Sequence, residues 1–170
     1  MSNEKQVDSY RYLDRITRKL VEKWIELESP REIPWTPLDK SLDECTIALL
    51  SSAGLARYTD QPFDQEGERE NPWWGDPSYR VLPRSVHPND IGLYHLHISP
   101  NLVEQDLNTL FPIQLLLELE EQGEIGRAAD SHYSYMGYIL QPQALLEQSV
   151  PAMIRQMKQE QVDAVLLVPG

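Results

Sequence analysis

Two short apolar runs constrain the fold of this chain more than any other feature of its sequence. They are residues 45–51 (CTIALLS) and 162–168 (VDAVLLV). The first run is nearly continuous, which is typical of a strand covered on both faces in a parallel sheet, and Ser52, Ala53 and Gly54 predict a tight turn after it. The second run is the clearest strand pattern in the chain. The two runs therefore predict a mostly parallel sheet.

Helical periodicity supplies the rest of the fold. Residues 7–27 carry apolar side chains three or four positions apart, which predicts an amphipathic helix with one core-facing stripe inside an N-terminal segment 1–28. Prolines then predict an extended linker over residues 29–41. Further patterns indicate a strand at 92–98, a helix from the cap at Asp106–Asn108 to Gly123, a strand or loop at 131–140, and a helix at 143–161 that Pro151 kinks or restarts.

Together these elements predict one α/β domain over residues 1–170, with its main region at 42–170. We expect three layers, a mostly parallel sheet with flanking helices. The order of elements leaves the last strand without a following helix, because the sequence stops at Pro169 and Gly170. The sheet is therefore expected either to be incomplete at this end or to finish in an edge strand.

Composition excludes several classes of protein. A hydrophobic content of 41% and a charged content of 25% are ordinary for a globular domain. The net charge of −12 disfavours nucleic acid and membrane surfaces as partners. The sequence has no apolar run of about 18 residues and no leader pattern, so we expect a cytoplasmic protein. A single cysteine, Cys45, permits neither an internal disulfide nor a cysteine-rich zinc site within these residues.

Three groups of side chains could carry chemistry. Asp76 and Arg80 in GDPSYR could orient a carboxylate substrate or hold the long loop 58–90 together. The run Ser131–Tyr133 combines a hydroxyl, an imidazole (His132) and a phenol, which could perform acid–base work or could satisfy one another.

His95 and His97 lie two apart on the predicted strand, so they would share one face and could bind a metal or be structural. No further ligand motif accompanies them, and we expect no metal.

Five ordered segments resemble one family. They are ALLSSAGLARYTDQPFD (48–64), GDPSYRVLP (75–83), DLNTLFPIQLLLELEEQGEIG (106–126), SHYSYMGYI (131–139) and VDAVLLVP (162–169). In this order they resemble the selenoprotein B family of glycine, sarcosine, betaine and D-proline reductases, over roughly residues 45–169. The stretch HLHISPNLVEQ before Asp106 departs from the histidine-rich, acidic pattern of that family, which leaves the substrate open.

The resemblance implies a reductase subunit that cleaves a C–N bond of a small amine or amino acid. In the family a selenocysteine or cysteine follows the strand that is similar to VDAVLLV, so the nucleophile would lie beyond residue 170 and the chain would be truncated, inactive alone and without a cofactor of its own. A pyruvoyl group on a partner subunit would activate the substrate. Other reductase subunits are the implied partners, and a homo-oligomer is also possible.

On matched positions the resemblance implies catalytic roles for His132, Asp106 and Asn108, and substrate-binding roles for Arg80, Asp76 and Tyr133. Two alternatives stay open. The chain could be a non-catalytic binding or scaffold module derived from this family, or His95 and His97 could serve metal-dependent hydrolysis.

Overall fold

The computed structural model describes residues 13–27, 36–71 and 73–170. The chain divides into two compact units, Met1–Pro37 and Leu38–Gly170. The described part of the first unit is the helix α1 (Arg15–Leu27). Asp14 begins this helix, because its carboxylate accepts hydrogen bonds from the backbone N–H groups of Ile16 (2.8 Å) and Thr17 (3.1 Å). The first part of the predicted helix, residues 7–12, lies outside the described residues.

The apolar stripe of α1 includes Leu13, Ile16 and Leu20, which are all exposed, with Ile16 keeping 82% of its surface accessible. That this stripe faces a core stays a prediction. Periodicity predicts the face of a helix and not what packs on it.

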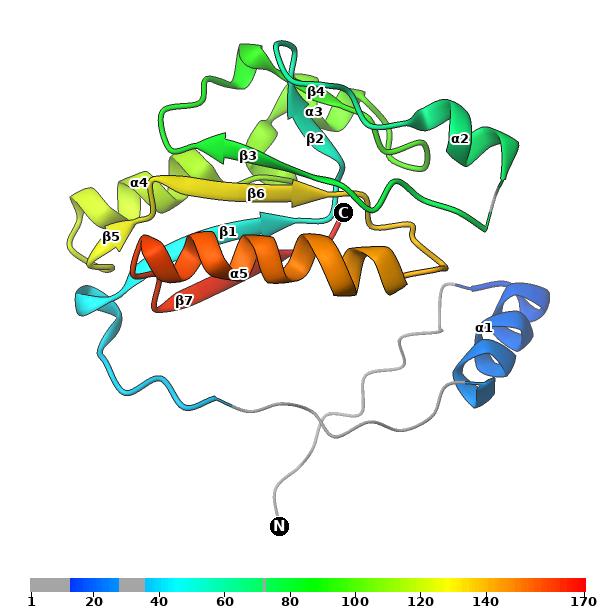
Figure 1. Cartoon of the computed structure of the whole chain (residues 1–170), viewed down its shortest axis with the longest axis horizontal. Helices are drawn as coiled ribbons and strands as arrows, with labels where there is room; N and C mark the ends of the chain where they lie inside the picture. Colours follow the sequence, from blue (N-terminus) through cyan, green and yellow to red (C-terminus); the bar gives the residue numbers. More distant parts are fainter. Residues whose placement is uncertain (1–12, 28–35, 72) are drawn as a thin grey trace. The chain divides into compact units, whose positions relative to one another are not determined.

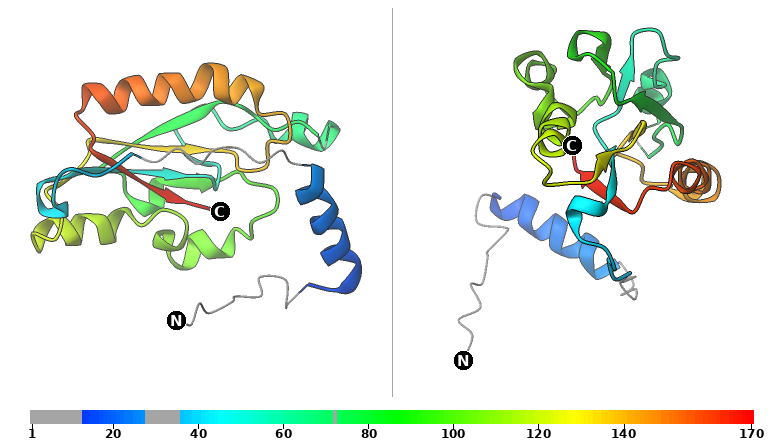
Figure 2. Two further views of the ribbon diagram at one scale, coloured as in Figure 1. Left: turned by 90° about the horizontal axis from the view of Figure 1, so that it is seen from below. Right: turned by 90° about the vertical axis from the view of Figure 1, so that its left-hand side faces the viewer.

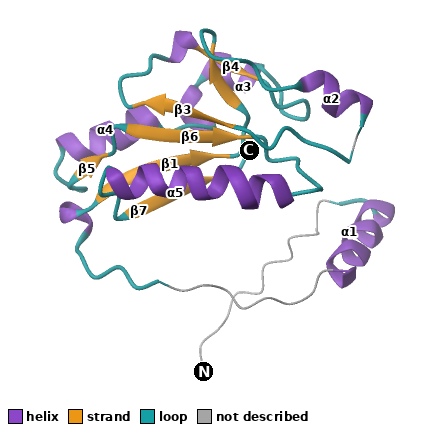
Figure 3. Ribbon diagram, viewed as in Figure 1, coloured by secondary structure: helices purple, strands orange, loops and turns teal. Residues whose placement is uncertain are grey.

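The second unit contains a mixed sheet that is mostly parallel, as the sequence predicts (Figures 1 and 3). Its strands are β1 (Thr46–Ser51), β3 (Tyr79–Pro83), β5 (Arg127–Ala128), β6 (Ser131–Tyr135) and β7 (Ala164–Val168). The central strand β1 is parallel to β5, β6 and β7, and β3 is antiparallel to β6. Strand β6 resolves the ambiguous stretch 131–140, which is a strand for its first half.

Helices cover both faces of the sheet and give the predicted three layers (Figure 2). On one face, α4 (Ile113–Glu121) and the short helix η3 (Leu107–Thr109) pack on the odd-numbered residues of β1, and Leu49 and Phe111 are completely buried there. On the other face, Met153 of α5 (Val150–Gln159) packs on Ala48 and Tyr133. Burial of these side chains is the main source of stability.

Strand β7 is more exposed than an apolar strand usually is. Among the described residues it pairs only with β1, so its outer edge carries unpaired backbone groups. Val165, Leu166 and Leu167 keep 37%, 48% and 67% of their surface accessible, and only Ala164 and Val168 pack against the main core cluster. The strand is therefore open at its edge and partly open on both faces.

Two predicted helices form with shifted boundaries. The helix predicted from Asp106 is η3 followed by α4, and Gly123, at φ +72°, ends it as expected. The helix predicted at 143–161 is the π-helical turn η4 (Leu145–Ser149) followed by α5, with Pro151 in the first turn of α5. Ser149 and Val150 keep α-helical dihedral angles, so the helix runs without a break over residues 143–159, and Pro151 follows its π-helical turn without starting a new helix.

The strand predicted at 92–98 is wrong beyond residue 93. Strand β4 (Ile91–Leu93) pairs antiparallel with β2 (Leu55–Arg57) in a separate small sheet, and residues 96–97 form a turn. The N–H of Tyr94 donates to the Gly54 carbonyl (2.9 Å), after which the chain bends away. His95 and His97 therefore do not share a strand face.

The long loop 58–90 contains elements that the sequence pattern does not indicate. They are α2 (Gln65–Glu70), β3 and the short helix η2 (Pro88–Asp90). The remaining short helices of this unit are η1 (Leu42–Glu44) and α3 (Asn101–Gln105). Across the described ranges no helix has both the length and the apolar character needed to span a membrane.

Candidate functional site

The carboxyl ends of the parallel strands meet at one edge of the sheet, where α/β proteins commonly bind ligands. The N–H of Ser52, just after β1, donates to the Val168 carbonyl of β7 (3.0 Å), and the N–H of Gly170 donates to the Ser52 Oγ (2.9 Å). Gly54, at φ +63°, then turns the chain away from the sheet. Residue 170 consequently lies at this edge, close to the end of β6 (Figure 1).

The turn at residues 95–98 lies against the same edge. A Cβ on Gly54 would be 3.3 Å from the backbone nitrogen of His95, and a Cβ on Gly170 would be 3.0 Å from the Cδ1 atom of Ile98. The N–H of His97 donates to His95 Nδ1 (3.1 Å), which fixes the His95 ring inside the turn. Two imidazoles are thus held beside the strand ends, although not by the strand that the sequence predicts.

Helix α2 brings a carboxylate to this turn. Asp64 caps the helix by accepting from the Gly67 N–H (2.9 Å), and the Gln65 side chain donates to the Tyr94 carbonyl (2.6 Å). Glu68 is only 3% exposed, and both its carboxylate oxygens lack hydrogen-bond donors within the part of the chain that the structure describes. Burial raises the pKa of Glu68, and the nearby His97 and Arg69 oppose that shift.

The His97 ring lies beside this carboxylate. His97 Nε2 is 3.6 Å from Glu68 Oε1, and the His97 side chain is 58% exposed. The His97 ring meets the Tyr138 ring edge-on at 4.7 Å between centroids and the His95 ring at 5.7 Å. His95 is buried, which lowers its pKa. Glu68, His95, His97 and Tyr138, which we call the carboxylate–imidazole cluster, can exchange protons or hold a cation.

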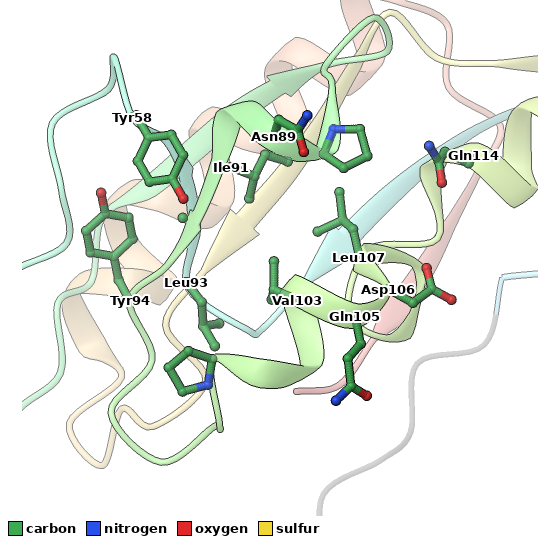
Figure 4. A pocket seen from close by; sticks show the side chains of 13 residues that line it. Tyr58, Asn89, Ile91, Leu93, Tyr94, Val103, Gln105, Asp106, Leu107 and Gln114 are labelled. Atoms are coloured by element: carbon green, nitrogen blue, oxygen red, sulfur yellow. The ribbon is translucent and has the colours of Figure 1, made fainter.

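A separate groove of about 690 Å³ lies between β4, α3 and η3 (Figure 4). Tyr58 and Tyr94 line one side, and Asp106 and Gln114 line the other (Figure 4). Asp106 accepts from the Asn108 N–H (2.9 Å) and from its side-chain amide (3.0 Å), and that amide also donates to Gln114 (3.0 Å). The two polar residues that the sequence singled out here stabilise η3 at the wall of this groove.

His132 and Tyr133 are completely buried and point to opposite faces of β6, because successive strand residues alternate. His132 Nδ1 accepts from the Leu49 N–H (3.0 Å), and its ring meets Phe111 edge-on, so it lies in the main core. Burial lowers its pKa to about 4. Tyr133 packs beside Met153 on the other face. The structure does not bring the two side chains to one cleft.

Asp76 and Arg80 brace the long loop. Asp76 accepts from the Asp64 N–H (2.9 Å) and from Ser78, and the Arg80 guanidinium donates to the carbonyls of Gln61 (2.7 Å) and Pro62 (3.0 Å). Arg80 also lies over the Phe63 ring, 4.1 Å from its centroid. These contacts agree with the loop-holding alternative, and a contact with substrate stays a prediction.

The six predicted site residues therefore lie in four places: the groove wall, each of the two core faces and the base of the loop. The carboxylate–imidazole cluster contains none of them. Glu68 could not be found from sequence, since it stands among other charged residues in QEGERE and resembles a solvated position. The sequence drew attention to His95 and His97 only as candidate metal ligands. Among the described side chains, no group of three or more metal-binding residues assembles.

The fold and the strand-end cluster define the class of this protein: a three-layer α/β protein with chemically active groups at the carboxyl edge of its sheet. A family model described as glycine/sarcosine/betaine reductase selenoprotein B matches residues 3–169. The chain belongs to this family.

A curated relative, D-proline reductase subunit gamma of Acetoanaerobium sticklandii, is 34% identical over 136 residues. The match covers 80% of this chain and 53% of the relative, so the chain spans about half the length of the curated protein that it matches. No solved structure matches the chain.

Proposed function

We propose that this chain is the sheet-bearing part of a reductase subunit that cleaves a C–N bond of a small amine or amino acid. Membership of the reductase family supports the reaction class. The observation that carries the proposal is the position of Gly170, bonded to Ser52 at the carboxyl edge and next to the histidine turn. A redox loop that follows Gly170 would start where ligands approach an α/β sheet.

The residues present fit such a loop. A Cβ at Gly170 would come within 2.8 Å of the Cα and Cβ atoms of Ala53, so the backbone has to pass this point without a side chain. The Glu68 carboxylate, which accepts no hydrogen bond from a described residue, lies beside His97 of the same turn. A selenocysteine or cysteine in that loop would supply the nucleophile and the electrons for reduction. This chain would bind and orient the substrate and hold a proton at Glu68 or His97.

The proposal also covers the partner subunits and the cellular location of the protein. Other reductase subunits are the proposed partners, one of them carrying a pyruvoyl group that activates the substrate amine. The curated relative is by its name one subunit of a D-proline reductase, which supports a multi-subunit assembly. We place this assembly in the cytoplasm, in agreement with the absence of a membrane-spanning helix from the described ranges.

The test begins with the DNA that follows codon 170. We expect UGA followed two codons later by a cysteine codon and then an open α/β-like frame. The full product is then assembled with its partner subunits and assayed with a dithiol against glycine, sarcosine, betaine and D-proline. Reductive C–N cleavage that is lost when the nucleophile is changed to Ser is the expected result. A frame without a redox motif, or an assembled complex inert on all four compounds, would contradict the proposal.

One observation favours a second function, a non-catalytic binding module. Strand β7 leaves Leu166 and Leu167 exposed beside an unpaired edge, and such surfaces mark interaction sites. The DNA that follows codon 170 also distinguishes the two proposed functions, because a UAA or UAG directly after this codon favours the binding module.

A further inference from the structure

A buried carboxylate without donors is unstable unless it takes a proton or a cation. Removing an ion from water costs several kcal/mol, which hydrogen bonds or an opposite charge must offset. Glu68 is only 3% exposed, and neither oxygen accepts a hydrogen bond from any described residue. An ionised carboxylate offers about four acceptor positions, so a ligand with N–H groups would supply the hydrogen bonds that this carboxylate lacks.

The basic side chains nearby do not supply these hydrogen bonds. His97 Nε2 is 3.6 Å from Oε1, which is longer than a hydrogen bond. Arg69 follows Glu68 directly on α2 and is exposed, and consecutive helical residues do not face each other. Arg80 is engaged with the carbonyls of Gln61 and Pro62.

The surroundings of Glu68 suit a small organic cation. His97 lies beside the carboxylate, its ring centroid is 4.7 Å from that of Tyr138, and aromatic faces attract ammonium groups. The His97 side chain is 58% exposed, so a ligand from solution can reach this ring. The net charge of −12 raises the local concentration of cations.

We propose that Glu68, with the rings of His97 and Tyr138, binds the ammonium group of a small primary or secondary amine. The carboxylate accepts the N–H donors, and the rings contact the carbons attached to the nitrogen. This site lies on the turn that touches Gly54 and Gly170, so the same ammonium group would be held beside the strand ends. Only its assignment to the substrate of reduction rests on the proposed function; ammonium binding by this chain does not.

The test is an NMR titration of the 170-residue chain with methylammonium and dimethylammonium chloride at constant ionic strength. We expect saturable shifts of the amide signals of α2 and of the 95–98 turn. Glu68→Gln should raise the Kd at least about tenfold. Glu66→Gln removes the same charge from an exposed position on the same helix and should leave the Kd unchanged. Tetramethylammonium, which has no N–H donor, should bind at least about tenfold more weakly.

His97→Leu keeps Glu68 covered but removes one ring, and it should weaken binding while the circular dichroism spectrum stays that of the wild type. This variant tests the site even if Glu68→Gln fails to fold. Absence of saturable binding, equal Kd values for wild type and Glu68→Gln in folded protein, or tetramethylammonium binding as tightly as methylammonium would each overturn the inference. If the assembled complex reduces a substrate but ammonium does not bind at Glu68, only the ammonium site is refuted. If ammonium binds at Glu68 but the complex is inert, only the proposed reductase function is refuted.

Discussion

At the scale of single residues, the buried His132 makes stability depend on pH. Folded His132 stays neutral down to about pH 4 because burial lowers its pKa from 6.5 to about 4, whereas the unfolded chain protonates it near 6.5. Acidification through this window therefore favours the unfolded chain, by roughly 2–3 kcal/mol at its lower end. We expect urea unfolding to show this loss between pH 6.5 and pH 4.

The control for this prediction is His132→Asn, which keeps an acceptor for the Leu49 N–H but does not titrate. Other carboxyl groups titrate in both proteins, so the difference between the two stability curves is the measurement. Parallel curves would show that His132 does not cause the acid dependence.

The Tyr133 hydroxyl gives a second residue-scale prediction. It is buried and finds no hydrogen-bond partner in the described ranges, and burial raises its pKa. Because the hydroxyl is desolvated without compensation, Tyr133→Phe should be at least as stable as the wild type, with a gain of up to about 1 kcal/mol in the free energy of unfolding. A urea titration measures this. A marked loss of stability would reveal a polar contact that the phenol makes.

At the scale of elements, the loop before β3 depends on Arg80. Its guanidinium joins the Gln61 and Pro62 carbonyls to β3 and covers Phe63, a geometry that lysine cannot reproduce. Arg80→Lys should therefore cost about 1–2 kcal/mol and speed hydrogen exchange at residues 60–78. Arg69→Lys, at an exposed position on α2, is the matched control. If hydrogen exchange at residues 60–78 is unchanged in Arg80→Lys, Arg80 does not hold this loop in place.

The elements that sequence could predict are those whose stability comes from a regular apolar pattern. The runs at β1 and β7 and the periodic residues of α4 and α5 predicted strands and helices close to those observed. Helix α2 and the histidine turn were missed. The helix has only six residues, with Asp64 accepting from the Gly67 N–H at its start, and the turn is fixed by the Gln65 side chain, which donates to the distant Tyr94 carbonyl. The burial of Glu68 follows from that same packing, so no local signal revealed it.

At the scale of the molecule, we expect β7 to govern how the chain associates. Its outer edge, which no described strand pairs with, and its exposed Leu166 and Leu167 favour pairing with a second chain. We expect the 170-residue chain to self-associate as its concentration rises in analytical ultracentrifugation, and Leu167→Lys to suppress this. Leu115→Lys, at a similarly exposed site on α4, should not. Equal association of both variants would place the contact elsewhere.

The pairing of β1 also sets the order of events during synthesis. Each described strand that pairs with β1 comes much later in the chain: Ile47 pairs with Ala128 and with Ala164. Such distant contacts are slow to form, because a long loop has to close first. While the ribosome is still making the middle of the protein, the apolar residues of β1 have no sheet to join. The nascent chain therefore keeps these residues without partner strands until β5 and β6 have emerged, and the pairing of β1 is complete only after Val168.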